Sequence, residues 1–349
     1  MGAMTAGPST EAGEVVWLRT DEALASAGRR HAALLARRVG LGAARAGDLA
    51  LAVTEAATNL QRHSTDGALA LRVAASGGQA DVEVLSLDSG PGITDLGAAL
   101  RDGSSTAGTL GLGLGTIRRL ADTFGIHTLP GRGTGVFARF RGPADPAAER
   151  FAVEVSGLTR PIGGESSCGD TWAAREQPSG NGSSALLVMA CDGLGHGPLA
   201  ARAADEARLA FRESRAEDPA RVLADLHTRL RGTRGAAIAV ARVDPAARRV
   251  ALCGAGNISG FVLGPDTRQQ LPSTPGIVGH NVGRPRTHEA DLPPGTALVL
   301  HSDGLSGRWQ AGDFPGLLGQ EPALIAGQLL WQAGTRRDDA GVVVVKVPS

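Results

Sequence analysis

The stretch Ala185-Leu-Leu-Val-Met-Ala-Cys-Asp-Gly-Leu-Gly-His-Gly197 decides how the second half of this chain folds. Its apolar part, residues 185–191, is continuous and of strand length, which predicts a buried β-strand. Asp192 ends that run and enters a glycine-rich turn, where the lack of side chains lets another backbone or a ligand come close. The stretch therefore predicts a strand that carries a carboxylate to one edge of a sheet.

Other carboxylates of the second half occupy the same kind of position. They are Asp170 after Gly169, Asp303 after the run 297–302, and Asp338 with Asp339 before the run 342–347. Carboxylates at strand ends can converge, and Mg²⁺ and Mn²⁺ prefer such oxygen ligands. Two such ions about 4 Å apart can activate water for in-line attack on a phosphate ester. A strand-terminal Asp-Gly pair is also ordinary turn chemistry, so the prediction depends on the whole arrangement.

The bulk composition limits the possible function classes. The chain has 349 residues, which at roughly 150 residues per domain predicts two domains. Its 35 basic and 35 acidic residues balance, so no overall field favours nucleic acid or a membrane as a partner. No apolar run reaches the roughly 18 residues that cross a bilayer, and residues 1–13 lack the features of a signal peptide. We therefore expect a cytoplasmic protein, and the oligomeric state stays open.

Residue usage excludes two kinds of site. Cys168, Cys191 and Cys253 form no CxxC pair, so neither a disulfide framework nor a structural zinc site is expected. The only lysine is Lys346, in a terminal apolar run with no glycine loop before it. Walker A loops and Hanks-type kinases both need a lysine beside the phosphates. A nucleotide bound here must be held in another way.

The order of predicted elements favours an α+β protein with two domains. In the first half, a helix that Asp21 can cap ends near Gly40, a second helix spans about 44–62, and two alternating runs form an antiparallel pair. This half predicts a sheet with helices on one face. The second half has many strands and few helices. We expect a disordered N-terminus at 1–13, domains at 14–142 and 151–349, and a linker at 143–150.

The first half also carries a candidate nucleotide site. Glu55 and Asn59 are one helical turn apart and point from one face, which also fits an exposed polar helix face. The Asn59 amide can bind Mg²⁺, and the Glu55 carboxylate can act on a reacting hydroxyl. Asp88 follows a strand and can accept a hydrogen bond from an adenine amino group. Gly90 and Gly92 belong to the tight turn at Asp88. The glycine-rich loop that contains Gly111, Gly113 and Gly115 runs into the N-terminus of the next helix, where backbone N–H groups and the helix dipole favour phosphate.

The carboxylate motifs of the second half stand in the order Cys168-Gly-Asp170, Asp192-Gly-Leu-Gly-His-Gly197, Ser302-Asp303-Gly304 and Arg337-Asp338-Asp339. Together they resemble the SpoIIE-like branch of the type 2C (PPM) protein serine/threonine phosphatases. The resemblance implies an α-β-β-α sandwich and a site for two Mn²⁺ or Mg²⁺ ions. In that site Asp192 would bridge both ions, with the Gly193 carbonyl as a further ligand, and Asp170, Asp303 and Asp338 would hold mainly one ion. The family's closing threonine is replaced by Gly341, which leaves Asp338 and Asp339 as alternatives.

The motifs of the first half are Glu55-Ala-Ala-Thr-Asn59, Asp88-Ser-Gly-Pro-Gly92 and Gly111-Leu-Gly-Leu-Gly115. They resemble the ATP boxes of the Bergerat (GHKL) superfamily, and Arg118-Arg119-Leu-Ala-Asp122 is similar to its anti-sigma-factor and stressosome switch serine kinases. The resemblance implies a Bergerat α/β sandwich that binds ATP with Mg²⁺. A sensor histidine kinase would need a phosphoacceptor helix hairpin before this domain.

Taken together, the motifs identify the chain as a switch-kinase-like domain fused to a SpoIIE-like phosphatase. By resemblance, the substrate would be a phosphorylated STAS-type protein that regulates a sigma factor or a stressosome. The rival interpretation makes the first domain a sensor of ATP, or a partner-binding module, that transfers no phosphate. A wholly non-catalytic adaptor would require both sites to be inert, and the retained Glu55, Asp88 and Asp192 argue against this.

Overall fold

The chain forms two compact units. The structure, a computed structural model, describes residues 8–100, 113–147, 151–163, 165–178 and 184–347. One unit, called here the N-terminal unit, comprises Gly13–Ala148. The other, the C-terminal unit, comprises Met1–Ala12 together with Glu149–Ser349. Each unit is an α+β structure with its own core, as the sequence predicts.

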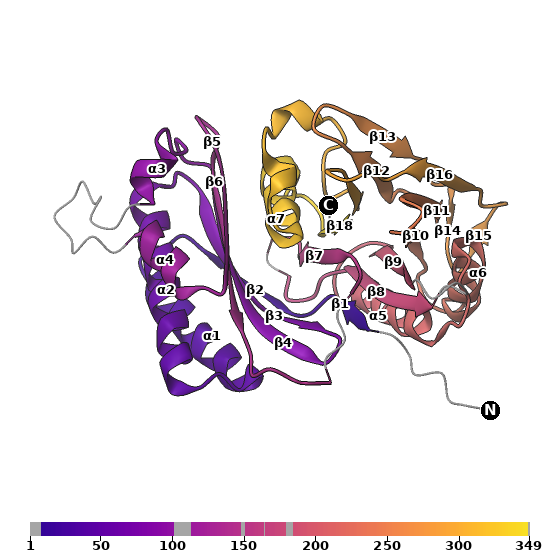
Figure 1. Cartoon of the computed structure of the whole chain (residues 1–349). Helices are drawn as coiled ribbons and strands as arrows, with labels where there is room; N and C mark the ends of the chain where they lie inside the picture. Colours follow the sequence, from indigo (N-terminus) through magenta and orange to yellow (C-terminus); the bar gives the residue numbers. More distant parts are fainter. Residues whose placement is uncertain (1–7, 101–112, 148–150, 164, 179–183, 348–349) are drawn as a thin grey trace. The chain divides into compact units, whose positions relative to one another are not determined.

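The N-terminal unit is a five-stranded antiparallel sheet with helices on one face (Figure 1). The strand order is β2-β3-β4-β6-β5. The strands are β2 (Val15–Arg19), β3 (Gly67–Ser76), β4 (Gln79–Asp88), β5 (Thr123–Leu129) and β6 (Gly133–Arg141). The helices are α1 (Leu24–Val39), α2 (Ala43–His63), α3 (Leu96–Ala99) and α4 (Leu114–Leu120).

Alternating apolar residues build the core of this unit. Val53 and Leu60 of α2 pack against Leu69 and Phe140, which face the helices from the sheet. Gly28 lets α1 approach α2, because a Cβ there would lie 2.8 Å from Val53 Cγ1. The sheet thus holds α2 with one side buried and leaves the side that carries Glu55 and Asn59 half-buried.

Helix α1 begins later than the sequence predicts. Asp21 does not cap it; its carboxylate accepts a hydrogen bond from the Ala23 N–H at 2.8 Å, because residues 21–23 form a turn before the helix. Ala23 occupies the N-cap position, and it offers no side-chain hydrogen bond to the first turn of the helix. The predicted end is correct: Gly40 has φ 81° and its N–H donates to the carbonyls of Ala36 and Arg37.

The C-terminal unit stacks two sheets between helices, as the resemblance implies. The first sheet has the order β1-β8-β9-β10-β11-β16, the second β13-β12-β17-β18-β7, and β14-β15 is a separate hairpin. The strands are β1 (Ser9–Glu11), β7 (Glu154–Arg160), β8 (Asp170–Pro178), β9 (Ser184–Gly193), β10 (Ala236–Asp244), β11 (Arg249–Ala255), β12 (Ser259–Leu263), β13 (Arg268–Leu271), β14 (Gly276–Ile277), β15 (Asn281–Val282), β16 (Thr287–Asp291), β17 (Ala297–His301) and β18 (Ala340–Lys346).

Helices cover the outer faces of both sheets. Helices α5 (Pro198–Glu213) and α6 (Pro219–Arg229) pack on the first sheet, and α7 (Pro322–Ala333) packs on the second. Two short 3-10 turns, η1 (Ala311–Asp313) and η2 (Leu317–Gly319), precede α7. Alternate residues of the strands fill the space between the sheets, among them Val188, Leu300 and Val343. This stacking brings together the ends of β8, β9, β17 and β18, which carry or adjoin aspartates.

The N-terminal segment differs from the prediction of disorder at 1–13. Ser9–Glu11 forms β1, which pairs antiparallel with β8 through the pairs Ser9–Arg175, Thr10–Ala174 and Glu11–Ala173. The Ala12 N–H also donates to the carbonyl of Trp172 at 2.8 Å. An open edge strand offers unpaired N–H and C=O groups to any extended segment, which local composition cannot reveal. The C-terminal unit is therefore built from both sides of the N-terminal unit in sequence.

The described part of the chain has two further features, which concern its cysteines and its helices. Cys168, Cys191 and Cys253 are free thiols. No helix in the described ranges is long and apolar enough to cross a membrane.

Candidate functional site

Two aspartates face each other across β8 and β9. Asp170, the first residue of β8, lies opposite Asp192 in the antiparallel register. Cβ atoms of directly opposite residues are about 4.5–5.5 Å apart, so both carboxylates lie on the same side of the sheet. Asp170 is buried, and Asp192 is half-buried.

The second sheet brings further carboxylates to the same place. Strands β17 and β18 pair with His301 opposite Val342, and the Ser302 N–H donates to the Gly341 carbonyl at 3.1 Å. Asp303 lies two residues after the end of β17, and Asp338 lies two residues before the start of β18. Both carboxylates lie close enough to Asp192 to act on its charge. Four chain segments that are far apart in sequence therefore meet in one acidic site.

The crowding of like charges alters the protonation of this site. Burial raises the pKa of Asp192 to about 7, and the charges of Asp303 and Asp338 add to the shift while a hydrogen bond from Asn257 opposes it. Burial, and then the charge of Asp192, raises the pKa of Asp170 well above its usual range. Oxygen ligands that repel one another in this way fit a divalent cation, because the cation removes the repulsion.

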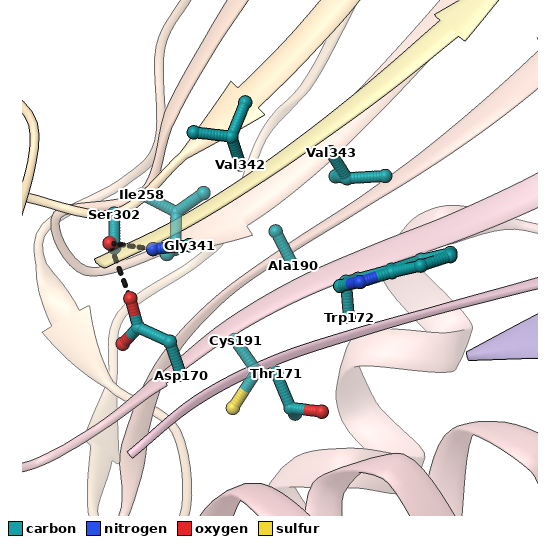
Figure 2. A pocket seen from close by; sticks show the side chains of 10 residues that line it. All are labelled: Asp170, Thr171, Trp172, Ala190, Cys191, Ile258, Ser302, Gly341, Val342 and Val343. Atoms are coloured by element: carbon teal, nitrogen blue, oxygen red, sulfur yellow. Dashed lines mark hydrogen bonds between the residues drawn. The ribbon is translucent and has the colours of Figure 1, made fainter. Parts of the chain in front are cut away.

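Ser302 fixes the orientation of Asp170 (Figure 2). The Ser302 hydroxyl donates to Asp170 Oδ2 at 2.5 Å, and the Gly341 N–H donates to Ser302 Oγ at 3.0 Å. Asp170 Oδ1 is buried without a hydrogen-bond partner among the described residues. A small pocket between the sheets, lined by Trp172, Ile258 and other residues, lies behind it. A buried, unpaired carboxylate oxygen is costly unless a proton or a cation satisfies it, which again fits a metal ligand.

Asp338 and Asp339 have different surroundings. Asp339 is 3% exposed, and both of its oxygens accept from backbone: Oδ1 from Ile162 N–H at 2.7 Å and Oδ2 from Gly169 N–H at 2.6 Å. It therefore fastens the β7–β8 loop, which carries Asp170. Asp338 is half-exposed, and one oxygen accepts the Asp339 N–H at 2.9 Å. The geometry favours Asp338 as the residue with an oxygen to spare for an ion.

Gly193 allows the close packing that closes this site. A Cβ at this position would lie 2.4 Å from the Ala200 carbonyl oxygen, so any side chain would push α5 away. The Gly193 N–H donates to the Gly169 carbonyl at 2.9 Å, which ties the Asp192 turn to the Asp170 segment.

Within the described residues, no three His, Cys, Asp or Glu side chains stand in complete ligating geometry around one point.

Asn257 is a site residue that sequence reasoning missed. Its side-chain Nδ2 donates to Asp303 Oδ2 at 2.7 Å, and its side chain also hydrogen-bonds Asp192. It lies in the turn between β11 and β12, directly after Gly256, whose φ is 102°. A polar residue in a glycine turn at a strand end is the same pattern that identified the aspartates. The sequence prediction did not include Asn257, because it was limited to carboxylates and one backbone carbonyl as metal ligands.

In the N-terminal unit, Glu55 and Asn59 lie on α2 as predicted, both half-buried. Burial raises the pKa of Glu55, and the Arg62 charge opposes this shift. A raised pKa brings a carboxylate closer to the range in which it can accept a proton at neutral pH.

Asp88 ends β4 and closes a tight turn. Its Oδ1 accepts the Gly90 N–H at 2.6 Å. Burial raises its pKa, while backbone hydrogen bonds from Gly90 and Thr134 and the charge of His63 oppose the shift. Side chains do not fit in this turn: a Cβ on Gly90 would lie 2.6 Å from the His63 carbonyl oxygen. Because His63 ends α2, the Asp88 turn lies against the end of the helix that carries Asn59.

The remaining predicted glycines differ in how far the structure describes them. Gly92 has φ 73°, and a Cβ there would lie 2.5 Å from the Leu129 carbonyl oxygen. Gly113 precedes α4, and Gly115 is buried within it, where α4 packs against α2. Gly111 lies outside the described residues. Helix α2 thus contacts both the Asp88 turn and α4.

Comparisons with known proteins agree with this geometry. The family described as "Stage II sporulation protein E (SpoIIE)" matches residues 182–348, and the family "Histidine kinase-like ATPase domain" matches residues 18–140. The serine/threonine-protein kinase RsbT of Bacillus subtilis (strain 168) is 32% identical over 104 residues, which are 30% of this chain and 78% of RsbT. The phosphoserine phosphatase RsbX of the same organism is 25% identical over 146 residues, 41% of this chain and 70% of RsbX.

One solved structure is described as "The bacterial stressosome: a modular system that has been adapted to control secondary messenger signaling". It aligns with a TM-score of 0.48 and 30% identity over 56% of this chain and 99% of that chain.

The folds and the carboxylate site define a type 2C protein serine/threonine phosphatase joined to an ATPase domain of the histidine kinase type. The chain belongs to the family of RsbT through its N-terminal domain, and it carries a SpoIIE phosphatase domain after it. The resemblance and the fold class predicted from the sequence are confirmed.

Proposed function

We propose that this phosphatase removes phosphate from serine or threonine of a STAS-type regulator in a sigma-factor or stressosome pathway, and that its N-terminal domain phosphorylates the same class of protein. The similarity to RsbT, named a serine/threonine-protein kinase, and to RsbX, named a phosphoserine phosphatase, supports opposing activities in one chain. The domain limits proposed are 14–142 and 151–349, with 143–150 as the linker and Ser9–Glu11 as an additional strand of the phosphatase.

In the phosphatase, two Mn²⁺ or Mg²⁺ ions are the cofactors. Asp192, the Gly193 carbonyl, Asp170, Asp303 and Asp338 would hold these ions. Bound there, divalent ions supply an activated water and neutralise charge on the phosphate. The chain's own residues orient the ligands: Ser302 holds Asp170, Asn257 holds Asp303, and Asp339 holds the loop that carries Asp170.

In the N-terminal domain, ATP with Mg²⁺ is the ligand. Asp88 accepts from the adenine amino group, Asn59 binds Mg²⁺, and Glu55 orients or deprotonates the attacking hydroxyl. The glycine-rich loop that leads into α4, with Gly111, Gly113 and Gly115, would bring backbone N–H groups to the phosphates, and Gly90 and Gly92 form the turn beside Asp88. The rival function is a sensor that binds ATP without phosphotransfer.

The convergence of four carboxylates carries the phosphatase proposal. Burial, together with the charges of Asp303 and Asp338, raises the pKa of Asp192 to about 7. The test is phosphate release from a phosphoserine peptide by the full chain with Mn²⁺, with Mg²⁺ and with EDTA. We expect activity with either metal, none with EDTA, and none in Asp192→Asn, whose folding is checked by circular dichroism. Undiminished turnover by a folded Asp192→Asn protein would falsify the site.

A further inference from the structure

The C-terminal unit gathers its exposed large apolar side chains around the Asp192 turn. Among the described residues they are Leu194, Leu199 and Ile277, exposed by 38%, 53% and 36%. Leu194 lies within the turn that follows Asp192, Leu199 lies in the first turn of α5, which begins directly after it, and Ile277 belongs to the β14–β15 hairpin. Single exposed apolar residues are normal, but a group of them beside a reactive site indicates a surface that contacts another molecule.

Backbone contacts join the hairpin to the Asp192 turn. The Leu194 N–H donates to the Gly235 carbonyl at 3.1 Å, and a Cβ on Gly235 would lie 2.7 Å from Ile277 Cγ2. Ala236 and Val278 exchange two backbone hydrogen bonds of 3.1 and 2.9 Å. Ile277 therefore lies against Gly235, whose carbonyl is hydrogen-bonded to the Leu194 backbone.

The base of the same hairpin lies beside the carboxylates. The Gly256 N–H donates to the Thr274 carbonyl at 2.9 Å, and the next residue, Asn257, binds Asp303. The Arg286 N–H donates to Thr274 Oγ1 at 3.4 Å. The hairpin thus runs along one side of the phosphatase site, from the Asp192 turn to Asn257.

Arginines without acidic partners stand along this side. Arg231, Arg234, Arg284 and Arg286 are exposed, and in the described part of the chain none of them forms a salt bridge. Arg234 lies against the Asp192 turn, since a Cβ on Gly195 would be 3.1 Å from its Nη1. Guanidinium groups that form no salt bridge within the described part of the chain favour carboxylates or phosphates of a partner.

We propose that Leu194, Arg234, Ile277, Arg284 and Arg286, called here the hairpin surface, bind the substrate protein and select its sequence. The surface takes a phosphorylated segment with acidic residues near the phosphoserine or phosphothreonine and an apolar residue to fill the space beside Ile277. Continuity with the carboxylate site makes the phosphorylated substrate the occupant. This inference rests on the proposed phosphatase function, whose substrate it narrows.

The test compares three phosphoserine peptides that differ only in their flanks, which are acidic, neutral or basic, with the full chain and Mn²⁺. We expect kcat/KM to be at least about tenfold higher for the acidic than for the basic peptide at low salt. The preference should shrink as salt is raised, because exposed charges are screened over about 8–10 Å at physiological ionic strength. Replacing the apolar residue of the acidic peptide by serine should raise KM.

Two charge-reversal variants locate the preference. Arg284→Glu with Arg286→Glu should lower the acidic-to-basic ratio of kcat/KM to about one or below, because like charges now face the acidic flanks. The matched control, Arg212→Glu with Arg215→Glu, makes the same change at the far end of α5, about 24 Å along a helix of 16 residues. The control should keep the wild-type ratio. A ratio of rates cancels any common loss of turnover.

The outcomes distinguish failure of the hairpin surface from failure of the proposed phosphatase function. Equal rates for all flanks, a preference for basic flanks, or equal effects of the two double variants would overturn the hairpin surface as a selective site. Hydrolysis of p-nitrophenyl phosphate by the wild type separates this failure from failure of the phosphatase proposal. If neither that compound nor any peptide is hydrolysed with either metal, the proposed function itself fails.

Discussion

The side-chain amide of Asn257 donates a hydrogen bond of 2.7 Å to Asp303, and the same side chain hydrogen-bonds Asp192. One neutral group thus links two carboxylates that repel each other. In Asn257→Ala we expect Mn²⁺ affinity to fall about tenfold or more, the usual range when a partner of a metal ligand is lost. The measurement is the rise in melting temperature on adding Mn²⁺ to metal-free protein, together with calorimetric titration.

Asn281→Ala is the matched control for this variant, because Asn281 is exposed in β15. It should show the wild-type response to Mn²⁺. The difference between metal-free and metal-loaded melting temperatures removes any general loss of stability. A wild-type difference in Asn257→Ala would show that the amide does not position the ligands.

Asp338→Asn and Asp339→Asn should have opposite effects. Asp339 accepts two backbone N–H groups while buried, so Asp339→Asn turns an amide NH₂ toward a donor and should cost about 1–3 kcal/mol of unfolding free energy. Asp338→Asn removes one of the charges that crowd Asp192, so the metal-free protein should be no less stable, but Mn²⁺ affinity should fall. Urea unfolding in EDTA and Mn²⁺ titration measure the two effects. The reverse pattern would make Asp339 the ligand.

Glu55→Ala separates a kinase from a sensor. Without the carboxylate the domain should still bind ATP, but phosphotransfer to a STAS-type partner should fall by about 10²- to 10⁴-fold. The assay requires the Asp192→Asn background, because an active phosphatase would remove the product. If the Asp192→Asn protein transfers no phosphate to any STAS-type partner tested, and ATP changes the phosphatase rate of the wild-type chain, the sensor interpretation is correct.

ATP binding should depend on the ionisation of Asp88. Burial raises its pKa above the ordinary 3.8, so as pH falls the carboxyl takes up a proton earlier than an ordinary aspartate. The protonated group is a poorer acceptor for the adenine amino group, and ATP affinity should therefore fall as pH is lowered through that raised value. Calorimetry in the Asp192→Asn background measures it. Inorganic triphosphate, which has no adenine, should lack this loss, and Asp88→Asn should bind ATP weakly at every pH.

The candidate sites could be predicted in outline because their residues follow local rules. Asp192 ends a continuous apolar run, Glu55 and Asn59 share a helix face, and Gly90 and Gly92 lie in a turn that has no room for a side chain. These patterns depend on the period of a strand or a helix and on steric demand within a few residues. The two-domain organisation and both fold classes follow from the same local patterns.

The tertiary structure alone decided which groups meet. Asp339 is occupied by the backbone of Ile162 and Gly169, more than 150 residues earlier, which leaves Asp338 free. Likewise, only the pairing of β12 with β17, which sets Ser259 opposite His301, brings Asn257 to Asp303, and only the open edge of β8 accepts Ser9–Glu11 as a strand. A carboxylate or an amide has the same local sequence pattern whether it binds a metal or a backbone N–H. Its role is set by the partner that strand pairing delivers from a distant part of the chain, and no local period encodes that partner.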